Sequence, residues 1–133
     1  MYEYLIDACV LSGFLNTEDV HHDACLVFFE SHAGERFCFS IHTLFEFKAS
    51  QSRRLCEGTF SPLSPLSLPK QRLFSLDKDF YEACQNKDLF RLFDKLKGAD
   101  LIYACLAKLH SLTLVTCDED FEQYSNIISI LQL

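Results

Sequence analysis

The sequence contains no tryptophan, one methionine, four glycines and three prolines among 133 residues. No apolar run approaches the length of about 20 residues that a membrane-spanning helix needs. The N-terminus also lacks a basic region followed by a long apolar stretch, so no secretory signal peptide is expected. These absences argue against a membrane protein and against an exported one.

Cysteine is abundant, but it does not follow any common motif. The number of cysteines is odd, no two are closer than 12 positions, and no CxxC spacing for zinc or redox chemistry occurs. Most lie in apolar patterns, where a free thiol packs as a small hydrophobic group. We therefore expect a reducing, cytoplasmic environment and no disulfide within the monomer. The seven residues are Cys9, Cys25, Cys38, Cys56, Cys84, Cys105 and Cys117.

The overall composition is that of an ordinary globular domain. Hydrophobic residues make up 49% and charged residues 23% of the chain, and the length suits one domain over residues 1–133. The formal net charge of -7 disfavours a protein that grips nucleic acid by bulk charge. It remains compatible with an enzyme that approaches phosphates through metal ions.

Short apolar runs alternate with segments of helical periodicity, which predicts an α/β protein with a mainly parallel sheet covered on both faces. The segment 57–70, with three prolines, is predicted to be a loop. Strands are expected at 4–7, 36–39, 112–116 and 127–131. Helices are expected at 8–15, from Val20 to Phe28, from Ile41 to Lys48, from Asp77 to Phe93, from Asp100, and at 118–124.

Four acidic residues stand where these elements end or turn. Asp7 closes the first apolar run, Asp118 follows Leu114–Cys117, Asp100 opens a helical stretch, and Glu46 lies within the pattern of another helix. In a parallel sheet, sites form beyond the carboxyl ends of the strands, where Asp7 and Asp118 would lie. Several carboxylates at one place repel each other, so such a cluster usually implies a divalent cation.

Each of these residues also has a simpler interpretation. Asp100 and Asp118 could cap the helices that follow them, and Asp120 could be an acid favoured by a helix dipole. His42 and Glu46 lie four residues apart and could share a metal, although such pairs are usually coincidental. Arg53 falls two turns beyond Glu46 on a similar helix face, so Arg53 and Arg54 are our candidates for contacts with phosphate.

Together these segments resemble PIN-domain ribonucleases, and among them the VapC toxins of toxin–antitoxin pairs. The first motif is Tyr4-Leu5-Ile6-Asp7-Ala8-Cys9, and Glu46 stands at the expected place of the second. Gly98-Ala99-Asp100-Leu101 and Thr116-Cys117-Asp118-Glu119-Asp120 are similar to the third and fourth. The chain departs from the family at Cys9, where Ser, Thr or Asn is common and usually supports the first carboxylate.

The resemblance implies a three-layer α/β/α PIN-like fold and a metal-dependent endoribonuclease. Asp7, Glu46, Asp100 and Asp118 would be catalytic, and Asp7, Asp100, Asp118 and Asp120 would hold Mg²⁺ or Mn²⁺. Thr116 would support a ligand carboxylate. The implied partners are an RNA substrate, a small antitoxin protein and a second copy of the chain in a homodimer.

The main alternative is a PIN-fold module that binds RNA or protein and has lost its cleavage activity. The complete set of four carboxylates argues against this alternative. A phosphatase that uses Asp7 as its nucleophile is a weaker candidate, because such enzymes usually carry a second aspartate where this chain has Cys9.

Overall fold

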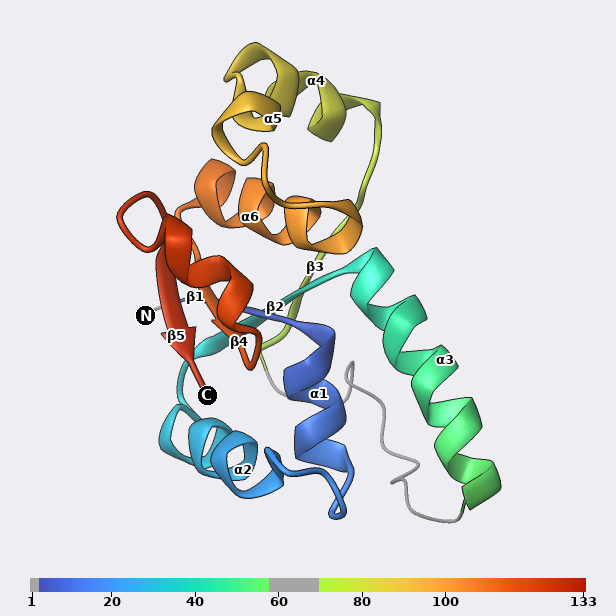
Figure 1. Ribbon diagram of the computed structural model, residues 1–133. Helices are drawn as coiled ribbons and strands as arrows, with labels where there is room; N and C mark the ends of the chain where they lie inside the picture. Colours follow the sequence, from blue (N-terminus) through green and yellow to red (C-terminus); the bar gives the residue numbers. More distant parts are fainter. Residues whose placement is uncertain (1–2, 58–69) are drawn as a thin grey trace.

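The fold is built around one five-stranded sheet in which every strand is parallel to its neighbours (Figure 1). The structure is a computed structural model that describes residues 3–57 and 70–133, without the side chains of residues 54–57. The strand order is β3-β2-β1-β4-β5. The strands are β1 (Glu3–Ile6), β2 (Arg36–Ser40), β3 (Arg72–Phe74), β4 (Thr113–Thr116) and β5 (Ser129–Gln132).

Helices cover both faces of the sheet, as the alternating pattern predicts. On one face lie α1 (Ala8–Leu15), α2 (His22–Ser31) and α3 (Ile41–Glu57), and on the other lie α4 (Lys78–Asn86), α5 (Leu89–Leu92), α6 (Gly98–His110) and the 3₁₀ helix η2 (Glu119–Tyr124). Neighbouring strand residues point to opposite faces. Leu5 therefore packs in the cluster beneath α6, whereas Tyr4 and Ile6 pack beneath α1 and α2.

The sequence predicted most of these elements but missed two features. The three-residue strand β3 was not expected, and the helix expected from Asp77 to Phe93 is divided into α4 and α5. The break falls at Asp88, which has a positive φ of 56° that a continuous helix cannot contain. Most of the predicted loop at 57–70 lies outside the described residues.

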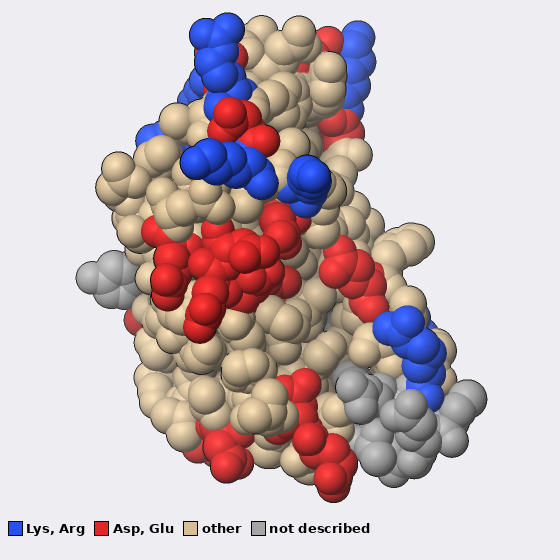
Figure 2. All heavy atoms as spheres, in the orientation of Figure 1, with Lys and Arg blue, Asp and Glu red and all other residues tan. Residues whose placement is uncertain are grey.

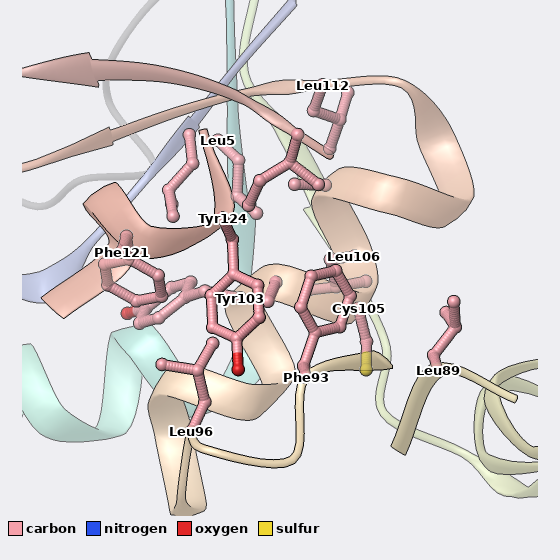
Figure 3. Packing of buried hydrophobic residues seen from close by; sticks show 14 of the residues in the cluster. Leu5, Leu89, Phe93, Leu96, Tyr103, Cys105, Leu106, Leu112, Phe121 and Tyr124 are labelled. Atoms are coloured by element: carbon pink, nitrogen blue, oxygen red, sulfur yellow. The ribbon is translucent and has the colours of Figure 1, made fainter. Parts of the chain in front are cut away.

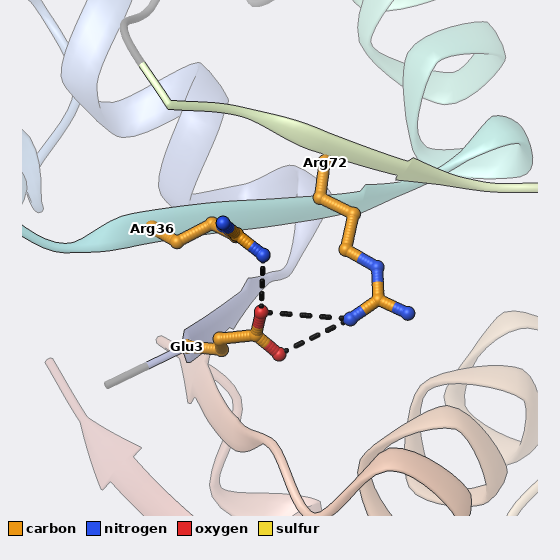
Figure 4. A network of polar contacts seen from close by, with 3 residues as sticks. All are labelled: Glu3, Arg36 and Arg72. Atoms are coloured by element: carbon orange, nitrogen blue, oxygen red, sulfur yellow. Dashed lines mark hydrogen bonds and ion pairs between the residues drawn. The ribbon is translucent and has the colours of Figure 1, made fainter. Parts of the chain in front are cut away.

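A polar contact joins three strands at their amino ends, opposite to the end where Asp7 lies. The Glu3 carboxylate accepts hydrogen bonds from Arg36 at 2.9 Å and from Arg72 at 3.2 Å (Figure 4). Glu3, Arg36 and Arg72 are the first residues of β1, β2 and β3. Because these groups are partly exposed, the contact contributes to strand register more than to stability.

The structure describes the side chains of six of the seven cysteines. Cys9, Cys25, Cys38, Cys84, Cys105 and Cys117 are all free, and four of them are buried. The side chain of Cys56 lies outside the described residues. Within the described ranges, no helix is both long enough and apolar enough to cross a bilayer.

Tyr103 fixes the position of α6 against the sheet and is among the largest fully buried side chains (Figure 3). Its hydroxyl accepts a hydrogen bond from the Ala8 backbone N–H at 3.1 Å and lies 2.6 Å from the Thr43 hydroxyl. One phenol therefore connects α6 with the first residues of α1 and α3. Burial raises the pKa of Tyr103, so the hydroxyl remains protonated.

We predict that Tyr103→Phe lowers the free energy of unfolding by about 1–3 kcal/mol, because it leaves buried polar groups at Ala8 and Thr43 without this partner. Urea unfolding measures the change. Tyr81→Phe is the matched control, because Tyr81 is 56% exposed, and it should change stability by less than about 0.5 kcal/mol. Equal stability of the Tyr103 variant and the wild type would contradict this role.

Candidate metal centre

Asp7 and Asp118 lie side by side because they follow two adjacent parallel strands. Asp7 comes directly after β1, and Asp118 follows β4 by two residues. The two strands are paired, with Ile6 opposite Val115, and the Asp7 N–H donates to the Val115 carbonyl at 3.1 Å. The sheet register alone therefore brings these two acids to the same edge, as expected from the sequence.

The hydroxyl of Thr116 joins the two acidic segments. It donates to Asp7 Oδ2 at 2.7 Å and accepts the Asp118 backbone N–H at 3.0 Å. Thr116 is fully buried and Asp7 is 7% exposed, so water does not compete effectively for these bonds. The predicted contact between Thr116 and an acidic side chain is thus present, and its partner is Asp7.

Asp100 approaches from α6 and completes a cluster with Asp118 and Asp120, whose nearest carboxylate oxygens all lie within 4.8 Å of one another. Asp118 has two roles, since its Oδ1 accepts the Asp120 N–H at 2.9 Å and so caps η2. Asp100 is not the N-cap of α6, a position that Lys97 occupies. Among the described residues, the Asp100 side chain has no hydrogen-bond partner, so the capping interpretation fails for this residue.

Glu46 extends the cluster from the first half of α3. Burial raises the pKa of Glu46, and the nearby charges of Asp7 and Asp100 raise it further. Burial, followed by the charges of Asp118, Asp7 and Asp120, raises the pKa of Asp100 to about 6. The pKa of Asp7 is also raised by burial, although the Thr116 hydrogen bond opposes this shift. The charges of Asp7, Asp118 and Asp120 therefore act on Asp100, and those of Asp7 and Asp100 act on Glu46.

These donors fit a hard divalent cation. All are carboxylate oxygens, the ligands that Mg²⁺ and Mn²⁺ prefer. A bound cation would remove the repulsion by neighbouring acids that, after burial, raises the pKa of Asp100. Acidic side chains gather in the middle of this face over η2 and the start of α6, with basic side chains along one border (Figure 2). Asp100, Asp118 and Asp120 offer oxygens close enough together to hold the ion, and Asp7, which lies outside that group, is near enough for its charge to raise the pKa of Asp100.

Cys9 supports the neighbouring segment in a way that the sequence did not indicate. Its sulfur accepts the Cys117 N–H at 3.3 Å and lies 3.8 Å from the Thr116 hydroxyl. A hydrogen bond with the Cys117 side chain, together with burial, raises the pKa of the Cys9 thiol, although the Cys117 backbone N–H opposes this shift, and the thiol stays neutral. Cys9 thus helps to hold the turn that carries Asp118, and it does not supply a thiolate ligand.

His42 is a half-buried neighbour of the acidic group, and the sequence left its role open. Its Nε2 lies 3.8 Å from Glu46 Oε1 and has no hydrogen-bond partner in the part of the chain that the structure describes, while Nδ1 is hydrogen-bonded to the Ser40 hydroxyl. Burial lowers the pKa of His42 to about 4, so the ring is neutral at pH 7. Thr43 and Tyr103 were not singled out, because the contact between their hydroxyls joins segments that are distant in the sequence.

The structure describes the side chain of one of the two arginines. Arg53 is exposed on α3, and the side chain of Arg54 lies outside the described residues. Their contact with phosphate remains a prediction.

The match with known proteins agrees with this geometry. The family profile described as PIN domain matches residues 4–127. The chain belongs to the PIN domain family. A search of curated proteins gave no significant match to the sequence.

Solved structures with the same fold include several toxin–antitoxin proteins. VapBC2 from Rickettsia felis, bound to a DNA fragment from its promoter, has a TM-score of 0.68 and 14% identity, with 98% of each chain covered. VapC20 from Mycobacterium tuberculosis, a sarcin-ricin loop cleaving toxin, has a TM-score of 0.67 and 16% identity, covering 90% of this chain and 93% of that one. FitAcB from Neisseria gonorrhoeae has a TM-score of 0.66 and 19% identity, with 97% and 96% covered. These TM-scores establish a shared fold, and at identities this low the similarity shows the fold alone.

We predict that Asp100→Asn leaves this PIN domain, without metal at pH 7, as stable as the wild type or more stable by roughly 0.5–2 kcal/mol. The pKa of Asp100 rises from 3.8 to about 6 on folding, so between these values the folded state binds more protons than the unfolded chain. The wild type therefore loses stability as pH rises through this window, and the advantage of the variant should shrink at pH 5. Unfolding in EDTA at both pH values measures the difference.

The wild type and Asp100→Asn also test whether Asp100 is a metal ligand. Mn²⁺ should stabilise the wild type by mass action, because only the folded state assembles the cluster, and it should stabilise Asp100→Asn much less. Equal gains would show that Asp100 is not a ligand. A metal-free variant far less stable than the wild type would assign Asp100 a structural role instead.

We predict that Thr116→Val weakens Mn²⁺ binding by about 10- to 100-fold, because removing the hydroxyl frees Asp7 and the segment of Asp118 to move. Thr116→Ser retains the hydroxyl and should bind nearly as the wild type does. Isothermal titration calorimetry distinguishes the variants. Wild-type affinity in Thr116→Val would mean that the bridge does not organise the ligands.

Proposed function

We propose that this chain, a single PIN-like domain over residues 1–133, is a metal-dependent endoribonuclease that hydrolyses RNA phosphodiester bonds. The observation that carries the proposal is the meeting of Asp7, Asp100 and Asp118, with Glu46 beside them, at the carboxyl ends of β1 and β4. Four acids from four segments meet at one edge of the sheet, at a cost in electrostatic repulsion that a divalent ion would offset.

In this proposal each acidic residue has a distinct task. Asp7, Asp100 and Asp118 hold Mg²⁺ or Mn²⁺, and Asp120 assists from the start of η2. When bound, such an ion neutralises the attacked phosphate and activates the attacking water. Glu46, whose side chain is 46% exposed, can reach substrate and orients that water or accepts its proton. The Thr116 hydroxyl keeps Asp7 and Asp118 in place.

The setting we propose is that of a cytoplasmic VapC-like toxin with a small antitoxin partner. The support is the PIN family membership together with the similarity in fold to toxin–antitoxin proteins such as VapBC2 and VapC20. A homodimer and phosphate contacts from Arg53 and Arg54 belong to the same proposal.

Cleavage of total RNA with Mg²⁺, Mn²⁺ or EDTA tests the proposed activity. Wild-type protein should cleave with either ion and not with EDTA. Asp7→Asn and Asp100→Asn should each lose more than about 100-fold in rate, because losing a ligand costs more than losing a supporting contact. Asp79→Asn is a matched control on α4 that removes an exposed acid and should cleave normally.

Two results would count against the proposal. Wild-type rates in both the Asp7 and Asp100 variants would show that the cluster does not carry out the cleavage. RNA binding by the wild type without cleavage under any metal condition would favour the binding module that has lost its activity.

A further inference from the structure

The geometry points to Phe45 as the residue on which an unpaired base of the RNA substrate stacks, next to the phosphate that is cleaved. This inference rests on the proposed function, because the RNA strand that it places along the outer face of α3 is the one that the acidic centre would cleave. It predicts a preference for single-stranded RNA or for a loop whose bases can turn outward.

Phe45 is the most exposed aromatic side chain of the described residues, with 73% of its surface accessible. The buried side of α3 is marked by Thr43, Phe47 and Gln51, which recur every four residues and are at most 4% exposed. Phe45 therefore points away from the core. Its ring makes no contact with another aromatic ring of the described residues, and most of its surface is accessible to a base.

The position of Phe45 distinguishes it from the other exposed apolar residues. It directly precedes Glu46, whose carboxyl group lies in the field of Asp7 and Asp100. Residues three and four apart are neighbours on a helix surface, so His42, beside Glu46, is also a neighbour of Phe45. Because Phe45 and Glu46 are adjacent in the chain, an RNA strand whose phosphate lies at the acidic centre would pass near the ring.

The charge on α3 favours a nucleic acid as the occupant of this surface. Beyond Phe45, the helix presents Lys48 and Arg53 in exposed positions, and Arg53 lies about 12 Å further along the axis. An aromatic platform followed by cations is the usual arrangement for binding single strands, in which bases stack and phosphates pair with the positive groups.

The absence of tryptophan from the chain makes a direct test possible, because Phe45→Trp introduces the sole tryptophan. A short oligouridine RNA in Ca²⁺ is titrated against this variant, and a gel confirms that the RNA stays intact. The tryptophan fluorescence should be quenched, whereas an abasic oligonucleotide of equal length, which keeps the phosphates, should have little effect. Tyr81→Trp, on α4 beside Phe90 and away from α3 in Figure 1, should not respond.

Cleavage kinetics provide the second readout. Phe45→Ala should raise KM for single-stranded RNA about 5- to 150-fold, the range that corresponds to the loss of one stacked base, with kcat changed little. Phe45→Tyr should restore KM. Circular dichroism shows whether each variant is folded.

The outcomes separate this inference from the proposed function. If the wild type does not cleave RNA, the proposed function fails, and the fluorescence titration still tests whether a base reaches Phe45. If the wild type cleaves but Phe45→Ala has an unchanged KM, or if the abasic strand quenches equally, the stacking role is wrong. Quenching by a purified protein partner and not by RNA would assign Phe45 to a protein interface and overturn the inference.

Discussion

The hydroxyl of Thr116 is the contact on which the arrangement of the acidic centre depends. Parallel pairing of β1 and β4 brings Asp7 and Asp118 to one edge of the sheet, but pairing fixes only their backbones. Thr116 fixes one carboxylate directly and the backbone of the other at the same time. Asp7 is buried and Asp118 is half-buried, so this hydroxyl, together with the strand pairing, keeps the two acidic segments in place when no cation is present.

The rest of the fold offsets the cost of gathering these charges. Tyr103 reaches from α6 to the starts of α1 and α3, so the helices that carry Asp100 and Glu46 are joined to the segment that follows Asp7. The hydrophobic clusters on both faces of the sheet hold these elements from behind. A centre that is unfavourable by itself is commonly tolerated within a stable framework when it serves a function.

The sequence allowed the sheet and the acidic residues to be predicted because both follow from local patterns. Apolar runs ending at Asp7 and just before Asp118 identify the strand ends, and parallel pairing then brings the two acids together. The strand β3 was missed because three residues, Arg72 to Phe74, are too short to show alternation. The break at Asp88 and the surroundings of His42 arise from backbone conformation and tertiary contact, which no local pattern reveals. The sequence did suggest a cap at Asp118, and the structure shows that this residue caps η2 while still facing Asp100.

The central claim is that these carboxylates form a binding site for a divalent cation. Anomalous X-ray diffraction from crystals soaked in Mn²⁺ tests it most directly, since the signal locates the ion without reference to activity. The account predicts a peak among Asp7, Asp100 and Asp118, at the oxygen distances of about 2.0–2.2 Å typical of small divalent ions. No peak there at saturating Mn²⁺, or a peak only at another surface, would contradict it.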